Sequence, residues 1–336
     1  MKQYRNGFMT LNHRLFVWMG LLVFAVYGVD IHGEENTQSI PPLPKGYANE
    51  TLLKAAILLK QIELIDPKNV PIPDTVVEEV NIEYGKAGDK SLQLDLYRPK
   101  EFEKPAPGLI FIHGGAWKSG KRQDMKFYAV HFAQKGYVCA TVSYRLMKEA
   151  LFPAAVQDVK CAVRWMRANA GKYYIDPERI AVSGNSAGGH LAMMIGYSSD
   201  VPELEGEGGY AGVSSRVQAV INFYGPVDLT TDFAKKQDGV VNFLGATYEE
   251  NPQQFVFASP LSHLTKDDPP TLIFHGTIDS TVPIGQADAL EQKLQSLGID
   301  YVYDKFVGWP HAMDLAKVVN DRCRYQMIQF LKKHLQ

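Results

Sequence analysis

The chain is poor in cysteine and lacks the cysteine spacings of metal and redox sites. Its 336 residues include three cysteines, Cys139, Cys161 and Cys323. Their spacing matches no CxxC or zinc-ligand pattern, so the sequence predicts no metal site of that kind. Each lies in an apolar strand or helical pattern, which favours a buried thiol. A single disulfide with one cysteine left over remains the alternative if the chain is exported.

Runs of like charge are also missing. The chain has 35 lysines and arginines against 37 acidic residues, which gives a formal net charge of -2. Without a basic stretch, nucleic acid is not an expected partner. Hydrophobic residues make up 46% and charged residues 21% of the chain, as in an ordinary globular protein rather than a disordered one.

An uncharged apolar run near the N-terminus, Leu15–Val29, is short for a membrane span. Three basic residues precede it, and small residues near its end allow cleavage just after Gly28. These features predict a signal peptide over residues 1–28 and export to the periplasm or the medium, with no stable membrane association after cleavage. An uncleaved N-terminal anchor is the alternative. Residues 29–75 are predicted to be a linker with a short helix over 51–65, ended by three prolines.

From residue 76 to 336 the chain alternates strand and helix signals, and we assign this stretch to one catalytic domain. Two segments with alternating polarity come first and predict an antiparallel pair. Short apolar runs separated by helical patterns then predict a parallel sheet with helices on both faces. The result is an α/β class with an eight-stranded, mostly parallel sheet. Residues 202–215 and 230–264 are the expected insertions, forming loops or a small cap. The predicted strands are 76–84, 92–97, 109–113, 137–143, 180–183, 217–223, 271–274 and 301–306, and the predicted main helices are 125–135, 155–170, 187–197, 286–297 and 312–334.

A G-x-S-x-G motif, Gly184-Asn185-Ser186-Ala187-Gly188, lies between a predicted strand and a predicted helix. Strand, sharp turn and helix form the context in which this motif exposes a serine hydroxyl as a nucleophile. Upstream, Gly114 and Gly115 follow another predicted strand in the segment HGGAW. Their N–H groups, with that of Ala187, are the predicted donors to an oxyanion.

A serine nucleophile needs a base, and the base needs an orienting acid. In chain order the acid precedes the histidine in folds that use this motif. His311, in the loop after the last predicted strand, is the predicted base, and Asp279, after the preceding strand, is the predicted acid. Asp228, which follows the strand 217–223, is the alternative acid.

Together these motifs resemble the hormone-sensitive-lipase-related α/β-hydrolases, and within them the bacterial feruloyl and acetyl-xylan esterase-like branch. The resemblance covers about residues 76–336 and implies the α/β-hydrolase fold and carboxylic ester hydrolysis without a metal or organic cofactor. Ala116 departs from it, because many relatives have a third glycine there. The residues that carry the resemblance are HGGAW at 113–117, YRL at 144–146, FPAAVQDV at 152–159, GNSAGG at 184–189, HGTID at 275–279 and PH at 310–311.

The sequence therefore predicts a serine esterase that transfers an acyl group through Ser186, His311 and Asp279, with a small-molecule or carbohydrate ester as its substrate. Trp117, Asn185 and Trp309 are the predicted substrate-binding residues. A secreted serine peptidase, an arylformamidase-like amidase and a non-catalytic binding protein are the alternatives. The acyl group, the alcohol and the oligomeric state stay open.

Overall fold

The computed structural model describes residues 39–335, so the predicted signal peptide lies outside the described residues. Eight strands form one sheet in the order β1-β2-β4-β3-β5-β6-β7-β8. Strand β2 is antiparallel to both β1 and β4, and every other neighbouring pair is parallel. This is the mixed sheet that the sequence predicts. The strands are β1 (Val76–Ala87), β2 (Lys90–Pro99), β3 (Ala106–Ile112), β4 (Val138–Val142), β5 (Ile175–Asn185), β6 (Ala219–Phe223), β7 (Thr271–Gly276) and β8 (Tyr301–Phe306).

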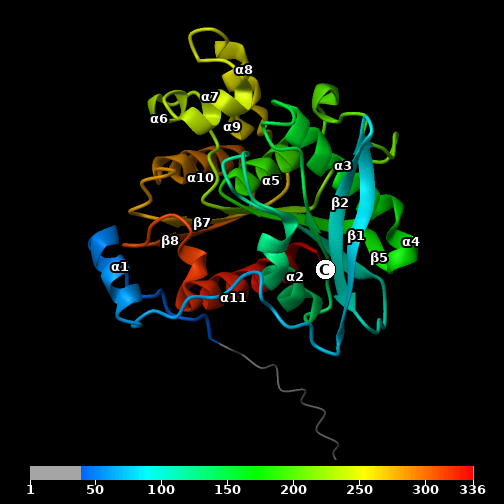
Figure 1. Ribbon diagram of the computed structural model, residues 1–336, viewed down its shortest axis with the longest axis horizontal. Coiled ribbons are helices and arrows are strands. Elements are labelled where there is room, and N and C mark those ends of the chain that lie inside the picture. Colours follow the sequence, from blue (N-terminus) through cyan, green and yellow to red (C-terminus); the bar gives the residue numbers. More distant parts are fainter. Residues whose placement is uncertain (1–38, 336) are drawn as a thin grey trace, which may run out of the picture. The chain divides into compact units, whose positions relative to one another are not determined.

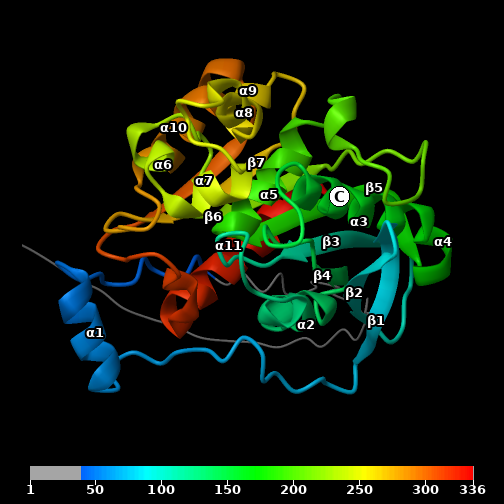
Figure 2. The same ribbon diagram turned by 45° about the horizontal axis from the view of Figure 1, so that its top comes forward.

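Successive side chains of a strand point to opposite faces of the sheet, so the sheet contributes side chains to two apolar cores, one on each face. On β3, Leu109 and Phe111 belong to one core, whereas Ile110 and Ile112 belong to the other. Helices α2 and α11 cover the first face, and α3, α5 and α10 cover the second (Figures 1 and 2). Uninterrupted apolar runs such as VCATV in β4 follow from this burial on both sides.

The main helices agree with the predicted ones to within a few residues, except that the last begins later than expected. A short 3-10 turn, η3 (Met313–Leu315), separates the loop of His311 from that last helix. The helices of the core are α2 (Lys126–Ala133), α3 (Ala154–Ala168), α4 (Ala170–Tyr173), α5 (Ala187–Tyr197), α10 (Gly285–Leu297) and α11 (Lys317–His334), with a 3-10 turn η1 (Arg122–Met125) before α2.

Residues 40–75 form one compact unit with the rest of the described chain, although the sequence predicts a linker there. The helix in this stretch, α1 (Glu50–Leu58), is shorter than predicted and buries Leu53 and Ala56 in the core beneath α11. Leu64 forms a bridge with Ala316, and the indole N–H of Trp309 donates to the Pro44 carbonyl at 3.3 Å. These contacts fix the stretch beside the loop of His311, which is why it does not behave as a linker.

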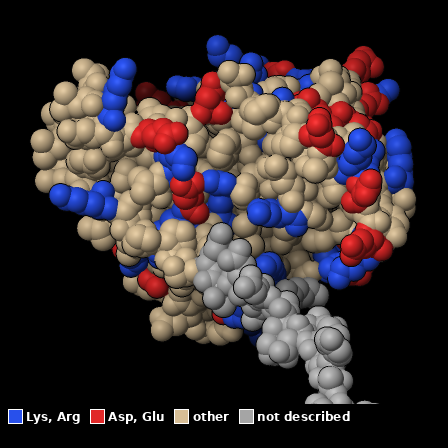
Figure 3. Space-filling view, turned by 90° about the horizontal axis from the view of Figure 1, so that it is seen from below, with Lys and Arg blue, Asp and Glu red and all other residues tan. Residues whose placement is uncertain are grey.

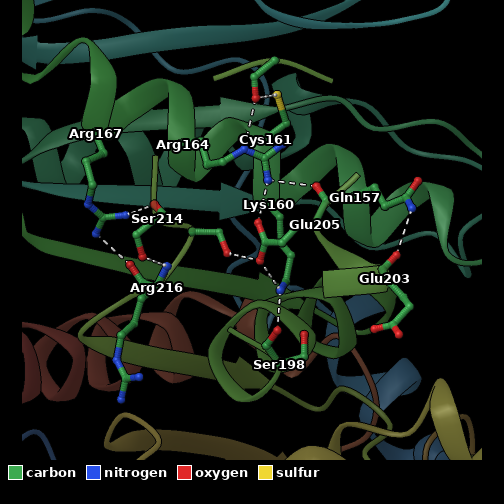
Figure 4. A network of polar contacts seen from close by, with 12 residues as sticks. Gln157, Lys160, Cys161, Arg164, Arg167, Ser198, Glu203, Glu205, Ser214 and Arg216 are labelled. Carbon is green, nitrogen blue, oxygen red and sulfur yellow. Dashed lines mark hydrogen bonds and ion pairs between the residues drawn. The ribbon is translucent and has the colours of Figure 1, made fainter. Parts of the chain in front are cut away.

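The Gly-rich insertion after α5 contains the 3-10 turn η2 (Pro202–Leu204) and is held along α3 (Figure 4). The fully buried amine of Lys160 contacts the Ser198 carbonyl and donates to Glu205 at 2.7 Å. Arg164 donates to the same carboxylate at 2.7 Å. Glu205 thus compensates the charges of two cations of α3, one of them fully buried. These ion pairs hold the insertion against α3.

The second insertion is a small helical cap, as predicted, and it lies above α5 and α10 (Figure 1). Phe243 of the cap stacks on Trp117, with ring centroids 4.4 Å apart, and so joins the cap to the HGGAW loop. Its helices are α6 (Asp232–Lys235), α7 (Asp238–Leu244), α8 (Pro252–Phe257) and α9 (Pro260–His263).

Charges of both signs are interspersed on the face shown in Figure 3. Among residues 39–335, no helix is both long and apolar enough to cross a bilayer. The three cysteines are free and buried, which confirms the buried thiols that the sequence predicts.

Candidate active site

Ser186, the predicted nucleophile, sits on a strained turn between β5 and α5. Its backbone has φ 55° and ψ -120°, a conformation that non-glycine residues rarely adopt. The turn is held from both sides, because Ser186 N–H donates to the Phe223 carbonyl at 2.8 Å and its own carbonyl accepts from His190 N–H at 3.0 Å. The sharp turn that the motif predicts is therefore strained in the structure, and neighbouring elements hold it in place.

The glycines of the motif permit a very close approach of helix and strand. A Cβ on Gly184 would lie 2.1 Å from the Gly188 carbonyl oxygen, and a Cβ on Gly188 would lie 2.1 Å from that of Ile112. No side chain fits against backbone oxygens at such distances. The absence of side chains lets α5 begin directly against β3 and β5, which points its N-terminus at the serine.

Substitution of Gly188 by alanine is expected to destabilise the fold by about 3 kcal/mol, because backbone cannot yield as a flexible side chain does. Urea unfolding of the purified variant measures this loss. Gly171→Ala is the matched control, since nothing lies within 4 Å of a Cβ at that helical position. An equal effect of the two substitutions would contradict the close-approach argument.

The HGGAW loop runs beside the serine. A Cβ on Gly114 would lie 3.3 Å from Ser186 Cβ and 2.8 Å from the Asn185 carbonyl oxygen. Gly115 has φ 109°, and Ala116 and Trp117 also have positive φ values. Ala116, which departs from the family pattern, therefore adopts a backbone conformation that favours glycine. The loop brings its backbone next to Ser186, where an oxyanion would form.

His311 and Asp279 are hydrogen-bonded. His311 Nδ1 lies 2.7 Å from Asp279 Oδ2, and the other oxygen of Asp279 accepts the N–H groups of Thr281 and Val282, both at 2.8 Å. The Asp279 side chain is fully buried, whereas that of His311 is 20% exposed. The carboxylate is thus held rigidly against the histidine, as an orienting acid must be.

Gly276 explains how β7 can end so close to the loop of His311. A Cβ at this position would lie 2.0 Å from the Trp309 carbonyl oxygen. The glycine of the HGTID segment thereby lets the turn that carries Asp279 lie against the segment that carries His311.

Asp228, the alternative acid, is engaged elsewhere. Its Oδ1 accepts from the backbone N–H and the hydroxyl of Thr230, at 2.8 and 2.6 Å, and so closes a turn before α6. Of the two candidate acids, only Asp279 has a hydrogen bond with His311 among the described contacts.

Two histidines favour the ionised form of Asp279. Burial opposes ionisation, but hydrogen bonding to His275 and His311 outweighs it and lowers the pKa of Asp279 to about 2. An unfolded aspartate has a pKa of about 3.9. The ionised carboxylate therefore stabilises the fold above about pH 4, and this contribution is lost as the pH falls through about 2.

The corresponding prediction concerns acid stability. The free energy of unfolding should fall between pH 6 and pH 2 by about 2 kcal/mol more in the wild type than in Asp279→Asn, which has no carboxyl to titrate. Urea unfolding at both pH values measures the difference. An identical fall in the two proteins would contradict a depressed pKa for Asp279.

Ser186 and His311 both line a cavity of about 500 Å³. Gly114, Gly115 and Asn185 contribute to its wall. The opposite side comes from the N-terminal stretch, where Ile65, Pro67 and Lys68 line the same space. Neither of the two insertions, 202–215 and 230–264, contributes a residue to this cavity. The sequence predicts a cap over the site from these insertions, but residues of the segment 65–68 line the cavity instead. Motif reasoning missed them because no motif marks an N-terminal segment that folds back on a site.

The predicted substrate-binding residues lie deeper than expected. Trp309 is 1% exposed, with its ring edge-on to Tyr47, and Trp117 is packed between Phe243 and His190. Neither tryptophan lines the cavity described above. Both rings are large apolar surfaces that the N-terminal stretch and the cap cover, and the sequence does not reveal that coverage. Asn185 does line the cavity, but its amide nitrogen is bonded to Asp314 and Tyr224.

The strand order, the strained serine turn after β5 and the histidine after β8 define an α/β-hydrolase. The chain belongs to the BD-FAE family, whose sequence model matches residues 94–294. Esterase LipC of Mycobacterium tuberculosis is 36% identical over 238 residues, which are 68% of this chain and 59% of LipC. For the related LipQ and LipM the chain likewise spans 63% and 56% of their lengths.

Solved structures agree with this assignment. A truncated carbohydrate esterase from gut microbiota superposes with a TM-score of 0.69 at 29% identity, covering 79% of this chain and 98% of that one. The butyrate-bound esterase Est2 of Thermogutta terrifontis gives a TM-score of 0.66 at 26% identity, with coverages of 77% and 94%. The resemblance to hormone-sensitive-lipase-related esterases is therefore confirmed at the level of family and fold.

Proposed function

We propose that the chain is a serine carboxylic-ester hydrolase that forms an acyl-enzyme on Ser186. The observation that carries the proposal is the 2.7 Å contact between His311 and Asp279 beside a cavity that also contains the strained Ser186. Relatives and structural neighbours that are named esterases support it. Among residues 39–335, no cluster of potential ligands suits a metal ion, and the proposed chemistry uses side chains and backbone alone.

The first half of the reaction is acylation. His311 Nε2 accepts the hydroxyl proton of Ser186 while Oγ attacks the ester carbonyl. Asp279 holds Nδ1 protonated, so that Nε2 is free to act as the base, and it stabilises the imidazolium that forms. The N–H groups of Gly114, Gly115 and Ala187 stabilise the negative charge on the carbonyl oxygen.

The imidazolium of His311 then protonates the leaving alcohol, and the bond between the carbonyl carbon and the alcohol oxygen breaks, which completes acylation. In the second half, deacylation, water loses a proton to His311 and attacks the acyl-enzyme. Collapse of the second tetrahedral intermediate releases the acid and returns the proton to Ser186.

We further propose short-acyl esters as the substrates, including acetylated carbohydrate. A cavity of about 500 Å³ with an apolar wall from Ile65 and Pro67 suits a small ester. The carbohydrate esterase among the structural neighbours supports the carbohydrate assignment.

The test is hydrolysis of p-nitrophenyl acetate, butyrate and octanoate by the purified chain, with acetylated xylan as a fourth substrate. We expect kcat/KM to be highest for acetate or butyrate and to fall at least about tenfold for octanoate, which is the pattern of a short-acyl esterase. Acetate release from xylan would support the carbohydrate assignment. Failure to hydrolyse any of these esters would overturn the proposal and direct attention to amide substrates.

We also propose export, on the strength of the run Leu15–Val29 and the three basic residues that precede it. Expression of the full chain in a bacterial host, followed by fractionation and mass spectrometry of the N-terminus, tests this. A mature protein that begins near residue 29 supports cleavage. An intact N-terminus in the membrane fraction would favour an anchor, and one in the cytoplasm would contradict export.

A further inference from the structure

A buried carboxylate, that of Asp314, lines the same cavity as Ser186 and His311. It belongs to η3, three residues after His311, and is 1% exposed. The proposed mechanism does not use it. A buried carboxylate is costly unless several donors compensate it, so the donors around Asp314 indicate why it is present.

Three donors from three different elements converge on its two oxygens. Tyr128 of α2 donates to Oδ2 at 2.9 Å, and the amide nitrogen of Asn185 donates to the same oxygen, also at 2.9 Å. The hydroxyl of Tyr224, which directly follows β6, donates to Oδ1. Burial raises the pKa of Asp314, and these hydrogen bonds oppose that rise. One side chain therefore joins α2, the end of β5 and the end of β6 to the loop of His311.

Two of these donors touch the proposed machinery. Asn185 immediately precedes Ser186, and its amide nitrogen also donates to the Tyr224 hydroxyl at 3.1 Å. The ring of Tyr224 packs edge-on against the imidazole of His311, with centroids 4.5 Å apart. Tyr224 has φ 41°, so its backbone is strained as well. The same carboxylate thus contacts the neighbour of the nucleophile and the ring that supports the base.

We propose that Asp314 is a positioning residue, which fixes Ser186 and His311 relative to each other through Asn185 and Tyr224. This inference rests on the proposed function, because it concerns the geometry of the same reaction. Asp314 takes no part in proton transfer in the mechanism above. Its role is to hold the turn of Ser186 and the loop of His311, which come from different segments of the chain, in a fixed relative position. Misplacement of reacting groups by about 1 Å can lower a rate by about 100-fold.

The most direct test is Asp314→Asn. An amide in place of the carboxylate keeps the side-chain volume but removes the charge and presents an NH2 group to at least one of the three donors, so at least one of these hydrogen bonds is reversed or lost. We expect kcat for p-nitrophenyl acetate to fall about 10- to 100-fold with KM changed less than about threefold. The rate at which a fluorophosphonate labels Ser186 should fall in parallel.

The matched control is Asp304→Asn. Asp304 on β8 is 7% exposed and accepts two hydrogen bonds from Arg322, at 2.6 and 3.0 Å, away from the cavity. This change also removes the charge of a buried, compensated carboxylate, so it too should lower the melting temperature. Its kcat should stay within about twofold of the wild type, because Arg322 contacts no residue of the site. A purely structural role for Asp314 would make the two variants alike.

Tyr224→Phe decides the matter if Asp314→Asn does not fold. It removes the hydroxyl and keeps the ring against His311, and we expect kcat to fall about three- to tenfold with KM nearly unchanged. Where Asp314→Asn does fold, the double variant should lose less than the product of the two single losses, since both changes act on one network. A folded Asp314→Asn or Tyr224→Phe protein with wild-type kcat would overturn the inference. Absence of ester turnover in the wild type would instead overturn the proposed function, and the inference with it.

Discussion

Replacement of Ser186 by alanine is expected to lower kcat for p-nitrophenyl acetate by about 10⁵- to 10⁶-fold while leaving the protein folded. The loss is large because the proposed mechanism proceeds only through an acyl-enzyme on Ser186, and the remaining oxyanion donors supply only a small residual rate. Steady-state hydrolysis at high enzyme concentration measures it, with a melting curve to show that the fold is intact.

The fold should tolerate this change well, because alanine lacks only the hydroxyl. The serine hydroxyl has no part in the backbone bonds to Phe223 and His190 that hold the strained turn. A variant that keeps more than about one hundredth of the wild-type rate would show that another group is the nucleophile.

Replacement of Asp279 by asparagine is expected to lower kcat by about 10⁴-fold. An asparagine at this position can donate to His311 Nδ1, which would place the proton on Nε2 and leave no base for Ser186. Measurement of kcat and KM near neutral pH tests this, and KM should change little because Asp279 is buried behind the histidine.

Asp228→Asn is the matched control for this prediction. Asp228 closes a turn with Thr230 and has no described contact with His311, so its substitution should change kcat by less than about threefold. A large loss in Asp228→Asn together with a small one in Asp279→Asn would reverse the assignment of the acid.

Much of the architecture is predictable because it depends on local patterns. Apolar runs such as VCATV in β4 are buried on both faces, and this double burial is what distinguishes a central parallel strand in the sequence. The serine turn is also predictable from a local pattern. The close approach of the strand and the helix requires glycine at fixed positions on either side of the serine, and this spacing is visible in the sequence.

The remaining features depend on which distant segments meet, and no local pattern records that. Nothing in the sequence around Ile65 indicates that this residue lines the cavity of Ser186. Trp117 and Trp309 are predicted to bind substrate, yet other segments of the chain cover both rings. Asp314 is a similar case, because its importance arises from donors at positions 128, 185 and 224 that lie far apart in the chain.

Covalent labelling of the purified wild-type chain by a fluorophosphonate, followed by peptide mass spectrometry, tests the central claim most directly. The probe reacts with a serine that an adjacent base activates and so reports the nucleophile without a choice of substrate. We predict a single adduct on the peptide that contains Ser186, and no adduct in the Ser186→Ala protein. An unlabelled wild-type chain, or a label that persists elsewhere in Ser186→Ala, would contradict a serine hydrolase built on Ser186, His311 and Asp279.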